Sequence, residues 1–162
     1  MMLRWLPLLL VLALAPLAAA ATPPPPKQSI APYPPKPKVT TLGVTKYASL
    51  VSYCWQSDGK GICADGAGGS PKSTIAWRAG REVRIDFRLP AREVSAQTVH
   101  IATPGAPPTH EVKLRAKRLD KAGRRYLVRL LSRSKGANEL TLFARFKEQG
   151  DVFAELGLRR LR

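Results

Sequence analysis

Hydrophobic and polar residues alternate with a period of two along most of the chain from residue 39 onward. Between Arg81 and Leu89, apolar side chains fall on one face and charged ones on the other; the apolar residues are Val83, Ile85, Phe87 and Leu89. Such alternation predicts a half-buried β-strand. The same period recurs at residues 112–117, 126–130, 140–146 and 152–158, and Glu148–Asp151 before the last stretch predicts a hairpin loop.

Three further stretches, residues 46–55, 61–65 and 94–103, complete a set of seven or eight predicted strands. The chain of 162 residues contains 12 Gly and 15 Pro, which argues against a helical bundle. Many short strands separated by turn residues favour an all-β, immunoglobulin-like β-sandwich. A small β-barrel is the alternative, because the number of strands alone does not distinguish the two.

The beginning of the chain predicts export. Arg4 precedes an apolar run from Trp5 to Leu17, and Ala18–Ala21 then offers the small residues that signal peptidase reads. A membrane anchor is the alternative, but the run is shorter than the roughly 20 residues that span a bilayer. We therefore expect a signal peptide at residues 1–21, a Pro-rich linker at residues 22–38 and one folded domain at residues 39–162.

The segment Tyr53–Asp65 contains both cysteines and predicts a disulfide-linked hairpin. An Asp-Gly pair at residues 58–59 favours a two-residue type I′ turn, which places Cys54 opposite Cys63 at a non-hydrogen-bonded pair. The Cα separation expected there, about 4.5 Å, suits a disulfide. The alternatives are a redox pair, which lacks the Cys-x-x-Cys spacing, and half of a metal site, which lacks nearby ligands. Trp55 alternates to the opposite face and is expected in the core.

This hairpin resembles a motif of small exported proteins and lipoproteins of Gram-positive bacteria, in which a Tyr-Cys-Trp strand pairs with a Cys-x-Asp strand. Here the matching residues are Tyr53-Cys54-Trp55 and Cys63-Ala64-Asp65. The resemblance extends over most of residues 39–161 and implies an immunoglobulin-like exported domain without an established activity. Many members carry a lipid-modified cysteine at the signal cleavage site, and this chain has none there.

No catalytic, cofactor or metal motif is recognisable in the sequence, so we expect a non-enzymatic protein without cofactors. Asp65 ends a strand beside a Gly-rich stretch, where a carboxylate is expected to cap backbone amides rather than act as an acid. His100 and His110 are expected to be a strand residue and a loop residue. An enzyme or inhibitor that uses loops without a known motif stays open as an alternative.

The charge of the chain suggests an anionic partner. The formal net charge is +16, and residues 113–135 hold ten Lys or Arg and one acid. The alternation predicts that five of these cations share the outer face of two neighbouring strands; they are Lys113, Arg115, Lys117, Arg125 and Arg129. We expect this face to hold the domain against anionic cell-envelope polymer, lipid headgroups or an envelope protein. A merely solvated face is the alternative.

Nucleic acid is the less favoured partner, because aromatic residues are not interleaved with these cations as base stacking requires. Tyr126 is the one aromatic residue between Glu111 and Asn138, and it alternates toward the core.

The signal peptide generates the first testable prediction. Because the apolar run and the alanines that follow it suit signal peptidase, the exported protein should begin after Ala20 or Ala21. Intact-mass measurement of the secreted or envelope-associated protein decides this. A membrane-bound product that begins at Met1 would show that the apolar run is an anchor instead.

Overall fold

The computed structural model describes residues 33–66, 71–103 and 106–162. The predicted signal peptide and the linker up to residue 32 lie outside these residues. The described chain forms twelve β-strands and one short 3₁₀ helix. They are β1 (Lys38–Thr41), β2 (Val44–Tyr47), β3 (Ser49–Ser57), β4 (Lys60–Asp65), β5 (Thr74–Trp77), β6 (Glu82–Asp86), β7 (Ala91–His100), β8 (Thr109–Leu114), β9 (Lys117–Arg118), β10 (Arg125–Arg129), η1 (Ser132–Ser134), β11 (Glu139–Phe146) and β12 (Gly150–Arg160).

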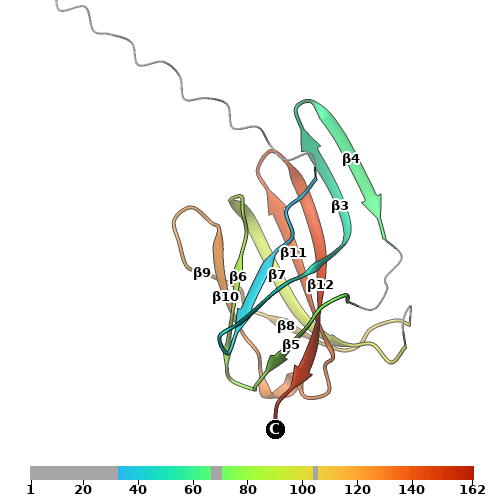
Figure 1. Cartoon of the computed structure of the whole chain (residues 1–162), viewed down its shortest axis with the longest axis vertical. Coiled ribbons are helices and arrows are strands. Elements are labelled where there is room, and N and C mark those ends of the chain that lie inside the picture. The colour runs from blue at the N-terminus through green and yellow to red at the C-terminus, as the bar shows by residue number, and fades with distance from the viewer. Residues whose placement is uncertain (1–32, 67–70, 104–105) are drawn as a thin grey trace, which may run out of the picture.

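The strands form two sheets that pack face to face as a β-sandwich (Figure 1). One sheet has the order β2-β1-β6-β10-β9, and the other has the order β4-β3-β12-β11-β7-β8. β5 joins the second sheet as a parallel neighbour of the last residues of β12. The prediction of an all-β sandwich is confirmed, although the described chain has twelve strands rather than the expected seven or eight, and the barrel alternative is excluded because the two sheets do not close into a barrel.

The core lies between the sheets and consists of the residues that the alternation places on one face. From the first sheet, Val83, Ile85, Tyr126 and Val128 point inward and are buried. From the second, the inward residues of β11 and β12 do the same; they are Leu140, Leu142, Ala144, Phe146, Val152, Ala154, Leu156 and Leu158. Burying a Val, Ile, Leu or Phe side chain contributes about 1.5–3 kcal/mol, so the residues that alternate inward on these four strands supply a large part of the stabilisation of the core.

Some strand boundaries differ from the predictions. The stretch 46–55 is interrupted at Ala48, which is buried and leads from β2 in one sheet to β3 in the other. β1 begins at Lys38, one residue before the predicted domain boundary. β5 was not expected, because a strand of four residues with two buried positions leaves little pattern in the sequence. No helix in the described part of the chain is long and apolar enough to cross a membrane.

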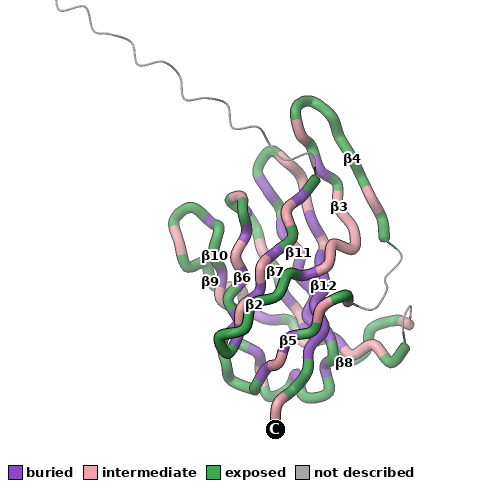
Figure 2. The backbone as a smooth tube through the Cα atoms, in the orientation of Figure 1, coloured by how far each residue is buried: buried purple, intermediate pink, exposed green. Residues whose placement is uncertain are grey.

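The cysteine hairpin forms as predicted. Asp58 and Gly59 have φ angles of 50° and 76°, as a type I′ turn requires, and Cys54 pairs with Cys63 across β3 and β4. The two cysteines form a disulfide with Cα atoms 4.1 Å apart. Trp55 is 1% exposed and packs in the core. Figure 2 shows that the rest of this hairpin is largely exposed and extends beyond the sandwich.

The loop between β11 and β12 contacts β3 of this hairpin, where the Gln56 amide donates to Gln149 O over 2.7 Å. It contains three residues, because Phe146 pairs with Gly150, so Gly150 and Asp151 belong to β12 rather than to the predicted loop. Gly150 has a φ of 107°, and a Cβ atom there would collide with the carbonyl oxygen of Cys54. A glycine is therefore required where the two hairpins meet.

Two carboxyl groups are buried beside each other on the seven-stranded sheet. Glu139 on β11 is 3% exposed and Glu155 on β12 is 8% exposed, and the register places them diagonally across the two strands. Burial and the neighbouring Glu155 carboxylate raise the pKa of Glu139 to about 7, and burial raises the pKa of Glu155 as well. A side-chain hydrogen bond joins the two groups, which indicates that the pair retains one proton.

We predict a pH-dependent stability from this pair. Between pH 4.5, the ordinary pKa of Glu139, and about 7, the folded protein retains a proton that the unfolded chain has released. The free energy of unfolding should therefore fall as the pH rises through this range, by at most about 1.4 kcal/mol per pH unit. Above pH 7 this effect should level off. Urea unfolding at pH 5 and pH 8 measures it.

Glu139→Gln should reduce this pH dependence, because the amide at position 139 does not titrate and only Glu155 of the pair is left to bind a proton. Glu148→Gln is the matched control, since Glu148 is exposed in the loop between β11 and β12 and its one ion pair with a described residue is a long one, 4.0 Å from Lys147 Nζ. The control should retain the behaviour of the parent protein. Equal pH dependence in the parent and in the Glu139→Gln variant would contradict the assignment.

The disulfide gives another stability prediction. Replacing Cys54 and Cys63 together by Ala should lower the free energy of unfolding by roughly 2.5–3 kcal/mol, because the unfolded chain loses a closed loop. Urea unfolding measures the change, and a reductant should destabilise the parent protein but not the double variant. Two free thiols in the oxidised protein, detected by alkylation and mass spectrometry, would contradict the bond.

Candidate anion-binding surface

The structure places the five predicted anion-binding residues on both sheets. Lys113 lies in β8 of the seven-stranded sheet, and Arg115 follows that strand. Lys117 lies in β9, and Arg125 and Arg129 lie in β10, both in the five-stranded sheet. All five side chains are exposed, as the alternation predicts.

The prediction that all five residues share the face of two neighbouring strands is wrong: β9 and β10, which carry Lys117, Arg125 and Arg129, do pair, but Lys113 and Arg115 lie elsewhere. β8 is the end strand of its sheet and pairs with β7, whereas β10 pairs with β6 and β9 in the other sheet. The chain crosses from one sheet to the other at residues 115–116, between β8 and β9. Lys113 and Arg115 are thereby separated from Arg125 and Arg129.

Ion pairs occupy much of the positive charge on the five-stranded sheet. Arg125 Nε lies 3.1 Å from Asp120 Oδ2, and Arg129 Nη2 lies 3.4 Å from Glu82 Oε1. Arg84 Nε lies 3.0 Å from Asp86 Oδ2 on the same outer face. Exposed pairs of this kind stabilise by about 0–1 kcal/mol each, but they lower the charge that this face presents to an anion.

Asp120 is fixed in its ion pair by the loop between β9 and β10. Desolvation acts to raise its pKa, but hydrogen bonds from the backbone of Arg124 and from Arg125 outweigh it and hold the pKa below its usual value. Asp120 is thus ionised at neutral pH and neutralises Arg125. This leaves Lys117 as the one predicted residue on the five-stranded sheet without an ion pair among the described residues.

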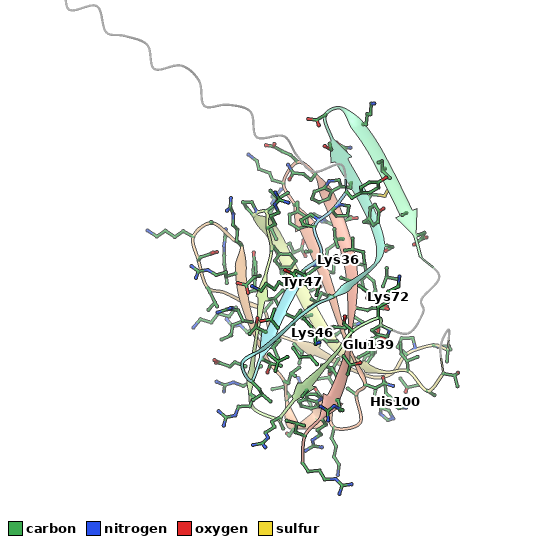
Figure 3. The ribbon with its side chains drawn as sticks, in the orientation of Figure 1. Lys36, Lys46, Tyr47, Lys72, His100 and Glu139 are labelled. Carbon is green, nitrogen blue, oxygen red and sulfur yellow. A yellow bond between two sulfur atoms is a disulfide. The ribbon has the colours of Figure 1, made fainter. Side chains whose placement is uncertain are left out.

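A denser group of cations lies at one end of the sandwich. Three segments meet there, residues 77–82, 129–135 and 159–162, and Glu82 is their one acidic residue. Their eight cations are all exposed, and we call this group the basic end; it consists of Arg78, Arg81, Arg129, Arg133, Lys135, Arg159, Arg160 and Arg162. Figure 3 shows nitrogen-tipped side chains extending from this end, near the terminus marked C in Figure 1.

Backbone hydrogen bonds hold the three segments together. The Gly80 amide donates to Leu130 O over 2.7 Å, and the Leu130 amide donates to Arg81 O over 3.2 Å. The Leu161 amide donates to Trp77 O over 2.8 Å, which completes the parallel pairing of β5 with β12. The backbone of the basic end is therefore fixed by the fold.

Trp77 anchors the centre of the basic end. Its ring is fully buried, and the guanidinium of Arg160 lies 5.8 Å from the ring centroid in a cation–π contact. Arg129 is the one member of the basic end with an ion pair in the described structure. The other members have no acidic partner there, so their charge is available to a ligand.

Sequence reasoning missed the basic end because its segments are far apart in the chain. The Arg159-Arg160 pair and the Arg78–Arg81 turn are each too short to stand out from a chain of this composition. The unexpected strand β5 is what brings them together. A pattern within one stretch of sequence could not have identified them as one surface.

The other residues singled out in the sequence are dispersed. Asp65 is exposed at the end of β4 opposite Ser52, and the stretch 67–70, which it was expected to cap, lies outside the described residues. His100 and His110 stand side by side with ring centroids 6.5 Å apart, and His110 lies in β8 rather than in a loop. Within the described ranges, no group of three or more His, Cys, Asp or Glu could hold a metal ion.

Comparisons of the chain with protein-family models, with curated proteins and with solved structures give no match. The resemblance of the cysteine hairpin to exported proteins of Gram-positive bacteria therefore stays a prediction. The candidate surface has to be interpreted from its own chemistry.

Proposed function

We propose that this chain is an exported, non-catalytic β-sandwich that attaches to anionic polymer of the cell envelope through its basic end. The observation that carries the proposal is the meeting of eight exposed cations and one acid at one end of the domain. Concentrating like charges costs free energy through repulsion, and a polyanion relieves that cost. Of the five residues expected from the sequence, this surface retains only Arg129, and the fold assembles its other seven cations from elsewhere in the chain.

Export is supported by two independent features. The chain begins with the charged, apolar and alanine-rich stretches of a predicted signal peptide, and the described domain contains a Cys54–Cys63 disulfide. Disulfides form and persist outside the reducing cytosol. An envelope location would also provide the anionic polymer that the basic end requires.

The test compares two variants with the same change in net charge. The first replaces five members of the basic end by Gln: Arg78, Arg81, Arg133, Lys135 and Arg159. The second replaces five exposed cations elsewhere, Lys60, Lys72, Arg92, Lys113 and Arg115, and includes two of the residues expected from the sequence. Binding to immobilised dextran sulfate, with uncharged dextran as the reference, is measured over a salt series.

The first variant should bind dextran sulfate at least about tenfold more weakly than the parent protein at 0.1 M salt, equivalent to about 1.4 kcal/mol. The second should bind within about threefold of the parent. Binding by the parent should weaken steeply toward 1 M salt, because the Debye length falls from about 10 Å to about 3 Å. Equal losses in the two variants would show that only net charge matters and would overturn the proposal. Tighter binding to DNA would favour the nucleic-acid alternative.

A further inference from the structure

A groove lies on the five-stranded sheet, away from the basic end. Its volume is about 560 Å³, which is within the range of sites that bind small molecules. Pro35 and Lys36 form one wall just before β1, and Lys38 on β1, Tyr47 on β2 and the segment Asp86–Arg88 after β6 form the rest. Figure 3 shows Lys36 and Tyr47 close together on this side of the molecule.

The groove is positively charged. Lys36, Lys38 and Arg88 line it, and none of them forms an ion pair with another described residue. Asp86 also lines it, but its carboxylate is bound by Arg84 Nε at 3.0 Å. Three cations thus face the groove, while the one acid is already neutralised. A ligand with a carboxylate or phosphate group would meet charge-assisted donors there.

The groove also presents an aromatic ring. Tyr47 is 58% exposed, which is unusual for a large aromatic side chain in a folded domain. The register of β1 and β2 places Tyr47 directly opposite Lys38, so the ring and an ammonium group stand side by side on one face. Phe87 is 5% exposed and forms part of the wall. The groove therefore combines a flat apolar surface with positive charge.

We propose that this groove binds an acidic sugar residue of a polysaccharide, with the apolar face of the sugar ring on Tyr47. The carboxylate or phosphate of the sugar would lie among Lys36, Lys38 and Arg88. This goes beyond attachment by charge at the basic end, because the groove would recognise a ring as well as an anion. Lys38 at the start of β1 lines the groove, whereas Thr41 at the end of β1 donates through Oγ1 to Glu82 O at the basic end, so the two surfaces lie at opposite ends of this strand and either one can act without the other.

A single exposed ring favours a sugar over single-stranded nucleic acid. Proteins that bind nucleic acid strands stack successive bases on several aromatic side chains. In this groove, Tyr47 is the one aromatic residue with a largely exposed ring among the lining residues. One ring suits the apolar face of one sugar.

The test measures binding of short ligands to protein purified from the full-length chain at 0.15 M salt. The probes are trigalacturonate, which carries carboxylates, glucose 6-phosphate, which carries a phosphate, and fully methyl-esterified trigalacturonate, which is neutral. Oligothymidylate of three nucleotides is the nucleic-acid probe. The variants are Tyr47→Ala and Arg88→Gln, with Lys60→Gln on β4 as a matched exposed control and the five-residue basic-end variant as a second control.

At least one acidic sugar should bind at least about tenfold more tightly than the neutral ester. Tyr47→Ala and Arg88→Gln should each weaken that binding by at least about fivefold, equivalent to about 1 kcal/mol. Lys60→Gln and the basic-end variant should bind like the parent protein, which separates this proposal from the preceding one. Equal binding of the neutral ester, tighter binding of oligothymidylate, no binding of either acidic sugar, or unchanged binding by folded Tyr47→Ala would each overturn the proposal.

Discussion

Four aromatic rings in edge-to-face contact cross the core and connect the two sheets. Trp55 on β3 meets Phe146 at the end of β11, with ring centroids 5.3 Å apart. Phe146 meets Phe87 at 5.9 Å, and Phe87 meets Tyr126 on β10 at 6.0 Å. Pairs of this geometry stabilise by about 0.5–1.5 kcal/mol beyond the area they bury. The Tyr126 hydroxyl donates to Ala91 O over 2.8 Å, and this hydrogen bond links the last of the four rings to the first residue of β7.

Both the hairpin and the groove depend on this chain of rings. Trp55 is the residue through which the exposed cysteine hairpin is anchored in the core. Phe87 directly follows β6 and is buried, while the next residue, Arg88, is exposed and lines the groove. The packing that joins the sheets therefore also positions a cation of the groove on the outer surface.

Local pattern predicted the strands better than it predicted their partners. Alternation identified the buried faces of β6, β10, β11 and β12, because burial on one side of a sheet requires a period of two. The Asp58–Gly59 turn fixed the register of the hairpin, since a two-residue loop allows one pairing. Sheet membership depends instead on long-range packing. The 115–116 crossover separates Lys113 from Arg125, and nothing in the local sequence signals it.

The same limit applies to charge. A count over residues 113–135 adds Arg125 and Arg129 to the positive total, although Asp120 and Glu82 neutralise both in the folded protein. A cation in an ion pair stabilises the fold, and it attracts an additional anion only weakly. A cation without an ion pair repels the cations beside it, and binding of an anionic ligand lowers the free energy of that repulsion. The places where several unpaired cations lie together therefore indicate where an anion would bind. In this fold they are the basic end and the groove.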